Sequence, residues 1–216
     1  METVFQVWPI LWLSLKVSGF AVLASSLIGL PLGVWMGLNH FPGKPFFVSL
    51  VHTGMALPPV VVGLLLYLVL SRSGPLGSLG WLFSSQAMIL AQIVLDLPFV
   101  VGITIVAVAS VPHELQWQLR SLGASPNQAR WEIVREARAG ILLAVATAFG
   151  RSLSEVGAVW LVGGNIEGQT RVLTTAIVLE TGKGNFAIAL FLGGILLTVA
   201  LTINLCIVRY QWRALP

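Results

Sequence analysis

The sequence predicts an all-α, polytopic membrane protein with five transmembrane helices, and three observations support this. The first is composition, because 56% of the 216 residues are hydrophobic and only 9% are charged, whereas soluble domains contain about 25% charged residues. The second is a mean hydropathy of +0.91. The third is a series of apolar runs, each long enough to cross hydrocarbon, which takes about 20 residues. They lie near residues 10–38, 46–70, 86–110, 140–163 and 187–208.

The first three spans carry proline or glycine inside their apolar runs. The start, METVFQVWPI, lacks the basic region of a cleavable signal peptide, so the first run is expected to remain as a helix. The motifs are GLPLG at 29–33, LPP at 57–59 and DLP at 96–98. Such breaks are tolerated where neighbouring helices or a water-filled cavity satisfy the backbone. They predict either ordinary kinks in packed helices or the lining of a moving pathway, with Pro58 and Pro59 as pathway candidates.

A charged segment, residues 112–138, separates the third and fourth spans. Pro112 can occupy the first position of a helix. An apolar stripe then follows one face of that helix, from Leu115 to Leu122. Gly123 comes directly after the stripe, where a C-terminal cap belongs. We therefore expect a short helix that ends in a sharp bend.

A second short helix should begin two residues after that glycine. Ser125, Pro126 and Gln128 have the types and spacing of an N-cap, a first helical residue and a capping-box partner. Ile133 and Ala137 give this helix an apolar face. Such a bent amphipathic pair either docks into a groove on another protein or rests on the lipid headgroups.

The fourth span contains the ionisable residues Arg151 and Glu155 within apolar sequence. Charges at membrane depth usually face the bundle interior and pair, and a spacing of four residues allows these two to pair on one helix face. The pair either fixes the rotation of the helix or, together with Ser152, forms part of a gate on a translocation pathway. Asp96, in the third span, has no sequence-local partner and could contact Arg151.

The connection between the fourth and fifth spans, GGNIEGQTRVLTTAIVLETGKGNF, is rich in Gly, Thr, Asn and Gln. Hydroxyls and backbone N–H groups can pass an oxyanion without trapping it. The segment is either a plain outer loop or a short re-entrant gate that also meets a periplasmic binding protein. The candidates for the second role are Asn165, Gln169, Thr170, Arg171, Thr174 and Thr175.

The distribution of Lys and Arg predicts the orientation, because cytoplasmic loops carry the excess. With the charged segment inside, seven basic residues lie on the cytoplasmic side and three on the other. The seven are Lys44, Arg120, Arg130, Arg135, Arg138, Arg209 and Arg213. The three are Arg72, Arg171 and Lys183. We therefore expect the N-terminus outside and the C-terminus inside.

Several classes of function are disfavoured by the sequence. The chain has no basic stripe interleaved with aromatic residues, which disfavours nucleic-acid binding, and the single Cys206 excludes an internal disulfide and a cysteine metal cluster. An intramembrane protease that uses Ser152 with His52 is a rival, although neither residue has an evident third partner. A passive anion channel is a second rival. Since five spans leave little room for a central route, a symmetric dimer would enclose a polar path.

The charged segment also resembles a known family. Leu122-Gly123-Ala124-Ser125, with Ile133 ten residues after the glycine, resembles the cytoplasmic EAA loop of type I ABC importer permeases. In this sequence Trp117-Gln118-Leu119 occupies the Glu-Ala-Ala positions, and Arg135-Glu136 replaces the closing Leu-Pro. Further blocks are similar, in the same order, to molybdate, tungstate and sulfate permeases. The short five-span form resembles the molybdate and tungstate members more than the sulfate ones, and residues 154–158, 163–165 and 171–181 most resemble tungstate permeases. The similar blocks are LSLKVSGFAVLASSLIGLPLG, FPGK at 41–44, LPPVVVGLLLYLVLSRSGPLG at 57–77 and FGRSLSEVGAVWLVGGNIEGQTRVLTTAIVLET at 149–181.

The resemblance implies a transmembrane type-1 domain over residues 10–208 that imports tungstate, or alternatively molybdate or sulfate. It also implies a homodimer in the cell inner membrane, with two ABC ATP-binding subunits and a periplasmic oxyanion-binding protein. ATP and Mg would bind the partner ATPase, because this chain has no phosphate-loop motif and needs no cofactor of its own. The implied contacts with that ATPase are Leu119, Arg120, Ser121, Leu122, Gly123, Ala124 and Ser125.

Overall fold

The computed structural model describes the backbone of residues 2–214 and the side chains of residues 7–207 and 209. This part of the chain is helical and has no strand. The helices are α1 (Glu2–Leu38), α2 (Lys44–Met55), α3 (Pro59–Leu70), the 3₁₀ helix η1 (Gly77–Leu79), α4 (Ser85–Ala109), α5 (His113–Ser121), α6 (Pro126–Glu136), α7 (Arg138–Ser154), α8 (Gly157–Gly163), α9 (Leu173–Gly182) and α10 (Phe186–Ala214).

Three of these helices are long and apolar enough to cross a membrane unaided, namely α1, α4 and α10. The pair α2 and α3 is bent by 94°, and the pair α7 and α8 is bent by 57°. If each bent pair is one span, the described residues contain five spans, which agrees with the five apolar runs. The second and fourth spans are therefore broken, the second at its LPP motif and the fourth at a position where the sequence predicted no break.

Helices α1 and α4 pack at very short backbone separation. A Cβ placed at Gly33 would lie 2.7 Å from Cβ of Thr104, and one placed at Gly29 would lie 2.8 Å from Cγ1 of Val100. Glycine is required here because the neighbouring helix occupies the space of a side chain. The GLPLG motif does not end the helix, since α1 is continuous through Pro31. Helix α4 is likewise continuous through Pro98, so DLP does not interrupt it.

The LPP motif does break the second span. Helix α2 ends at Met55, and α3 starts at Pro59 with Pro58 as its N-cap in an extended conformation. Proline at the first helical position is favourable, but its ring and missing N–H prevent the preceding helix from continuing. This accounts for the sharp turn between α2 and α3.

The two broken spans contact each other just beyond their breaks. A Cβ at Gly63 of α3 would lie 2.7 Å from Cα of Ala158, and one at Gly157 of α8 would lie 2.8 Å from Cγ2 of Val60. Around this crossing, a buried apolar cluster joins α3, α4 and α8 and includes Met88. The crossing therefore ties both bent spans to the long helix α4.

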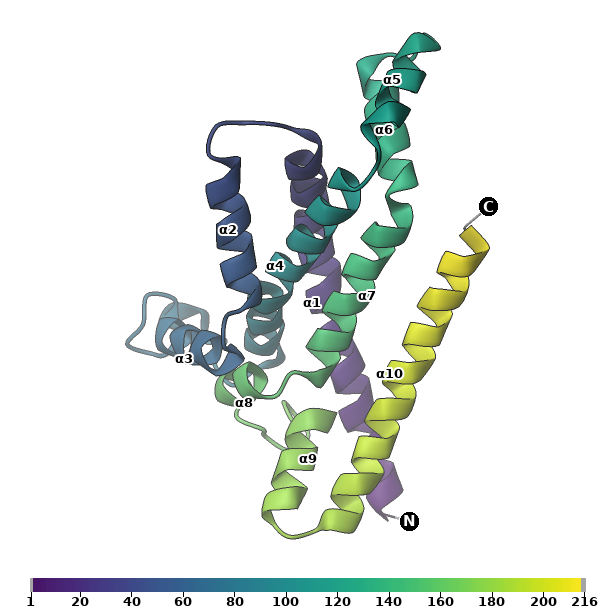
Figure 1. Cartoon of the computed structure of the whole chain (residues 1–216). Helices are drawn as coiled ribbons and strands as arrows, with labels where there is room; N and C mark the ends of the chain where they lie inside the picture. The colour runs from purple at the N-terminus through teal and green to yellow at the C-terminus, as the bar shows by residue number, and fades with distance from the viewer. Residues whose placement is uncertain (1, 215–216) are drawn as a thin grey trace.

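The bundle has two distinct ends. Helices α5 and α6 project from one end beyond α4 and α7, whereas α9 and the start of α1 lie at the opposite end (Figure 1). The outer faces of α1, α3 and α10 expose large apolar side chains, for example Leu27 at 78%, Leu65 at 58% and Leu197 at 72%. An apolar outer surface of this extent is typical of a chain surrounded by lipid or by other subunits.

Candidate coupling segment and buried polar cluster

The bend between α5 and α6 is closed by backbone hydrogen bonds. Gly123 has φ of +87°; its N–H donates to the carbonyl of Arg120 at 3.0 Å, and the N–H of Ala124 donates to the carbonyl of Leu119 at 3.0 Å. These two bonds form a Schellman motif, which satisfies the last carbonyls of a helix and favours glycine at the left-handed position. The predicted cap at Gly123 is confirmed. Helix α5 begins at His113, with Pro112 as N-cap, one residue later than predicted.

The start of α6 is fixed by a capping box. The backbone N–H of Gln128 donates to Oγ of Ser125 at 3.3 Å, and the backbone N–H of Ser125 donates to Oε1 of Gln128 at 2.8 Å. Pro126 is the first helical residue. This start agrees with the prediction. We call α5, the turn at Gly123 and α6 together the elbow. Because local hydrogen bonds hold both sides of its bend, the elbow is stiff without contacts from the rest of the fold.

The elbow is anchored at its base and exposes apolar side chains at its tip. Ile133 and Ala137 are buried against Val108 of α4. At the tip, Leu122 is 85% exposed. Trp117 and Trp131 are also exposed, at 76% and 69%; sequence reasoning missed both, although tryptophan in a charged segment was a usable signal. An exposed apolar tip on such a projection is compatible with a groove on a partner and with contact to lipid headgroups. The predicted coupling residues all lie in this projection: Leu119, Arg120, Ser121, Leu122, Gly123, Ala124 and Ser125.

Arg151 and Glu155 form the expected ion pair, but not on one helix face. Nη1 of Arg151 lies 3.7 Å from Oε2 of Glu155. Helix α7 ends at Ser154, and Glu155 is extended, with φ of −69° and ψ of 133°. The other carboxylate oxygen, Oε1, accepts a hydrogen bond from the backbone N–H of Ala158 at 3.1 Å. Glu155 therefore bridges the break by pairing with α7 and capping the first turn of α8.

Further polar groups surround this ion pair. The guanidinium of Arg151 lies 4.6 Å from the ring centroid of Phe99, in a cation–π contact. Asp96 of α4 is fully buried, and Ser152 and Arg151 are the polar neighbours of its carboxyl group. Nε2 of Gln92 donates to the carbonyl oxygen of Ser152 at 2.9 Å.

The hydroxyl of Ser152 lies close enough to the Asp96 carboxyl group to interact with it, but several atoms of this cluster have no partner at standard hydrogen-bond geometry within the described residues. They are both carboxylate oxygens of Asp96, Oγ of Ser152 and Oε1 of Gln92. A small cavity of about 10 Å³ is lined by Gln92, Ser152 and Glu155, and a volume of this size is about that needed for one water molecule. Unpaired polar atoms are costly inside a fold. Their concentration at one break marks this position as a functional candidate.

The threonine-rich segment after α8 is folded against the broken span. Oγ1 of Thr174 donates to the carbonyl of Glu155 at 2.9 Å, and Oγ1 of Thr170 donates to the carbonyl of Gly163 at 2.6 Å. The backbone N–H of Val172 donates to Oγ1 of Thr175 at 3.0 Å. Asn165 is buried as well. The segment is therefore not a plain outer loop, and its threonine hydroxyls are engaged by the chain itself.

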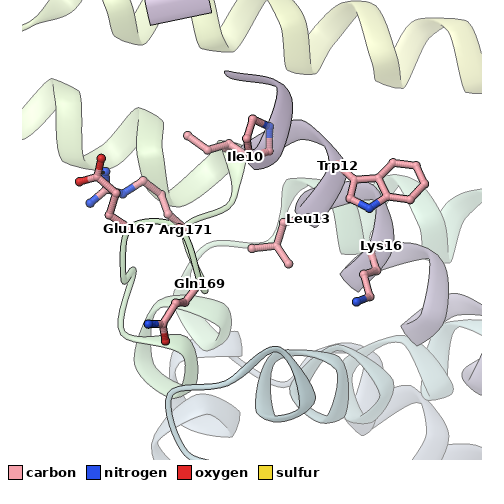
Figure 2. A pocket seen from close by; sticks show the side chains of 9 residues that line it. Ile10, Trp12, Leu13, Lys16, Glu167, Gln169 and Arg171 are labelled. Atoms are coloured by element: carbon pink, nitrogen blue, oxygen red, sulfur yellow. The ribbon is translucent and has the colours of Figure 1, made fainter. Parts of the chain in front are cut away.

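Gln169 and Arg171 have a different environment, because they line a cavity of about 360 Å³ beside the first half of α1. Figure 2 shows Trp12, Leu13 and Lys16 on the α1 side of this cavity. Nη1 of Arg171 pairs with Oε2 of Glu167 at 3.2 Å. Lys16 is the second cation of the lining.

The comparisons with known proteins agree with this architecture. A family model described as the binding-protein-dependent transport system inner membrane component matches residues 29–213. The chain belongs to this family. As such a permease, it is a transport subunit and not an enzyme by itself.

Among curated relatives, a probable anion ABC transporter permease protein of Haloferax volcanii is 45% identical over 205 residues, which cover 93% of this chain and 88% of the relative. The tungstate uptake system permease protein TupB of Peptoclostridium acidaminophilum is 38% identical over 206 residues, which cover 95% and 90%. The molybdenum transport system permease protein ModB of Escherichia coli is 34% identical over 195 residues, which cover 82% of each chain. The permease thus belongs to the branch that contains these anion permeases.

Among solved structures, a chain of the MetNI methionine ABC transporter in an inward-facing conformation superposes with a TM-score of 0.80 at 18% identity, covering 100% of this chain and 99% of that one. An amino acid ABC transporter chain gives 0.73 at 19% identity, covering 98% and 95%. Both share the fold of this permease.

Proposed function

We propose that this chain is the membrane-spanning subunit of an ATP-driven importer that moves tungstate into the cytoplasm by alternating access. The observation that carries the proposal is the stiff elbow with its exposed apolar tip, on a chain that has no phosphate-loop motif of its own. The choice of tungstate is supported by two TupB relatives, each 38% identical. Molybdate is the second candidate, supported by ModB at 34% identity.

The proposed complex contains two copies of this chain, two ATP-binding subunits that hold ATP and Mg, and a periplasmic oxyanion-binding protein. It resides in the cell inner membrane with the N-terminus outside. The orientation is supported by the gathering of Lys44, Arg120, Arg130 and Arg135 at the end of the bundle that carries α5 and α6, opposite α9 (Figure 1). This distribution satisfies the excess of basic residues expected on the cytoplasmic side.

In this mechanism the elbow transmits the closing motion of the ATPase to the helices. The tip around Leu122 enters a cleft on the ATPase, and the base around Ile133 passes the force to α4. The two broken spans then rearrange between two states, since packed helices tend to be bistable. Pro58 and Pro59 mark one break, and Glu155 marks the other.

The anion would pass near the cluster of Arg151, Ser152 and Glu155. Arg151 offers transient attraction to the oxyanion, while the carboxylate of Glu155 keeps the cation from trapping it. At the outer end, Gln169 and Arg171 form the entrance, where the chain meets the loaded binding protein. Thr170, Thr174 and Thr175 hold that entrance in shape through the hydrogen bonds of their hydroxyl groups, and Asn165 occupies a buried turn position beside them, with φ of +50°.

The test of substrate uses the assembled complex in proteoliposomes, with ATP and the purified binding protein. We expect uptake of tungstate to exceed that of molybdate when both oxyanions are present at low equal concentration. Preferential uptake of molybdate or sulfate would identify that anion, and not tungstate, as the substrate. Uptake without ATP would instead indicate a channel and would overturn the transport mechanism.

The test of coupling replaces Gly123 by glutamate. This change adds a side chain at a positive φ and a charge at the apolar tip, so we expect binding-protein-stimulated ATP hydrolysis to fall while the chain still inserts. A matched control is Asn127→Glu, which adds the same charge at an exposed helical position nearby. Equal activity of Gly123→Glu and the control would contradict the assignment.

The test of orientation uses cysteine labelling. In a Cys206→Ala background, Asn127→Cys should react with a membrane-impermeant maleimide only after the membrane is opened. Labelling of intact spheroplasts would place the elbow outside the cell and overturn the orientation.

A further inference from the structure

A third cavity, of about 170 Å³, lies where α5 and α6 meet the ends of α1 and α4. Its lining contains five basic residues and no aspartate or glutamate. They come from the connection after α1, the first residue of α2, and helices α5 and α6: His40, Lys44, His113, Arg120 and Arg130. Because basic side chains from four segments line one cavity, this site differs from an ordinary basic surface.

The charges of this cavity are not compensated by the chain. In the part of the chain that the structure describes, none of its basic residues takes part in an ion pair. Glu132, the carboxylate of α6 nearest to this region in sequence, pairs instead with Arg135 at 3.6 Å. Nζ of Lys44 donates only to the carbonyl of Asn39, at 3.1 Å. Like charges brought together repel each other, so a bound anion would stabilise this arrangement.

The lining also matches one kind of anion. Arginine presents a planar fork of N–H donors that suits the oxygens of phosphate-like groups, and lysine adds a point charge. Two helices start at the cavity, since Lys44 is the first residue of α2 and His113 is the first of α5, and the partial positive charge of a helix start adds to the attraction. The volume is below the roughly 300–1,000 Å³ of pockets for drug-sized ligands, so it suits a small group.

The excess of basic residues that sets membrane orientation does not require such a cavity. For orientation, the charges need only lie in the cytoplasmic connections, at any position near the ends of the spans. Here they surround one hollow together with Gln116 and a buried apolar floor that includes Val108 and Ile133. A basic pocket between helix ends is a form of site that binds anionic headgroups.

We propose that this cavity binds a tetrahedral phosphate-like oxyanion, carried either by the headgroup of an anionic phospholipid or by a free ion in solution. The bound anion bridges Lys44 of α2 and Arg130 of α6, and so joins the base of the elbow to the connection between the first two spans. This site lies apart from the cluster at Arg151 and from the cavity at Arg171, and its occupancy can be measured without transport.

The experiment uses the full-length chain, purified in a neutral detergent or held in nanodiscs. The probes are inorganic phosphate, and phosphatidylglycerol compared with phosphatidylcholine. Binding is measured by native mass spectrometry and by the rise in melting temperature. The variant Lys44→Gln/Arg130→Gln removes two cations from different segments. The control Arg135→Gln removes a cation of α6 that lies outside the cavity lining.

We expect the wild-type chain and Arg135→Gln to bind one of the two probes saturably. The double Gln variant should bind it at least about tenfold more weakly, since each charge-assisted hydrogen bond contributes a factor of this size. The variant Lys44→Arg/Arg130→Lys should retain most of the binding because it keeps both charges.

The two probes distinguish a free ion from a lipid headgroup as the source of the bound anion. Binding of phosphate in phosphatidylcholine nanodiscs identifies a free ion, whereas retention of phosphatidylglycerol against excess phosphate identifies a lipid. The proposal is overturned if neither probe binds the wild-type chain more tightly than phosphatidylcholine does. It is also overturned if the double Gln variant binds as the wild type does, or if Arg135→Gln loses binding to the same extent.

Discussion

Nη1 of Arg151 lies 3.7 Å from Oε2 of Glu155, across the point where α7 ends and the chain turns toward α8. The same carboxylate accepts the N–H of Ala158 in the first turn of α8. A single side chain thus connects the two halves of a broken span. Any rearrangement of this break must change at least one of these two contacts.

Replacing Glu155 by glutamine should weaken the contact between α7 and α8, because the ion pair with Arg151 is lost while the hydrogen bond from Ala158 can remain. Loss of the charge leaves Arg151 unpaired in a largely buried position, and we expect destabilisation of about 1–3 kcal/mol. The measurement is tryptophan-monitored unfolding in detergent. The double variant Arg151→Gln/Glu155→Gln should be less destabilised than the sum of the two single changes, by about 0.5–3 kcal/mol. Strict additivity would show that the pair does not interact.

Replacing Gly63 by alanine should disturb the crossing of α3 and α8. The added Cβ would lie 2.7 Å from Cα of Ala158, and backbone cannot move aside as a side chain can. We expect a loss of about 1–3 kcal/mol, the usual cost of overpacking, seen as a lower melting temperature. Gly194→Ala is the control, because nothing in the chain lies within 4 Å of its added Cβ and alanine favours a helix. A lower melting temperature for the control alone would contradict the packing.

Replacing Ser125 by alanine should loosen the start of α6. The side chain that accepts from Gln128 is lost, at a cost of about 1 kcal/mol. Amide hydrogen exchange in the first turn of α6 should therefore accelerate about fivefold, with little change in α4. Ser125→Thr, which keeps the hydroxyl, should exchange as the wild type does. If alanine and threonine behave alike, the capping box does not hold the elbow.

Replacing Leu122 by aspartate should weaken assembly with the ATP-binding subunit. The side chain is 85% exposed, so the change should not unfold the chain. If the tip is a central contact, we expect affinity to fall by roughly thirtyfold or more, as for the truncation of an interface hot spot. Pull-down titration measures this, and Leu122→Met, which keeps an apolar side chain, is the matched control. Equal affinity of both variants would place the contact elsewhere on the elbow.

The turn between α9 and α10 should respond to acid. Nζ of Lys183 and Nδ2 of Asn185 each donate to the carboxylate of Glu180 at 2.8 Å, and these hydrogen bonds, first that of Lys183, lower the pKa of Glu180 below its usual 4.5. Because the folded pKa is lowered, the contribution to stability is present above pH 4.5 and is lost as the pH falls through the folded value. Hydrogen exchange at residues 180–185 should rise in that window, after correction for intrinsic rates. Glu180→Gln should show no such rise, and an equal rise in this variant would exclude the carboxylate as the cause.

The elbow was the part of the structure most accessible from sequence. Gly123, Ser125 and Gln128 act through contacts only a few residues apart, so their types and spacing contain nearly all the information that the bend requires. The long apolar spans were predictable for the same reason, since their length and composition are local properties.

Contacts between segments that are distant in the chain could not be predicted from the sequence. The GLPLG motif predicted either a kink or the lining of a pathway, but its glycines serve close packing against α4, a partner some 70 residues later in the chain. Conversely, the fourth span has no proline at its break. The turn at Glu155 is stabilised by a tertiary hydrogen bond from Thr174, in addition to the local one from Ala158. The pairing of Arg151 with Glu155 was predicted from an i, i+4 helical spacing, and it occurs in a different geometry.

The glycines of α1 also limit where the molecule can deform. Gly29, Gly33 and Gly37 recur every four residues against Val100, Thr104 and Val108. If one helix slid along the other by less than a full turn, side chains of α4 would collide with the backbone of α1. We therefore expect α1 and α4 to move together as one rigid unit. The short helices α3 and α8 follow the two breaks and pack against each other, so we expect them to shift together relative to this unit. A change of angle at the breaks before α3 and α8 would alter this crossing without separating α1 from α4.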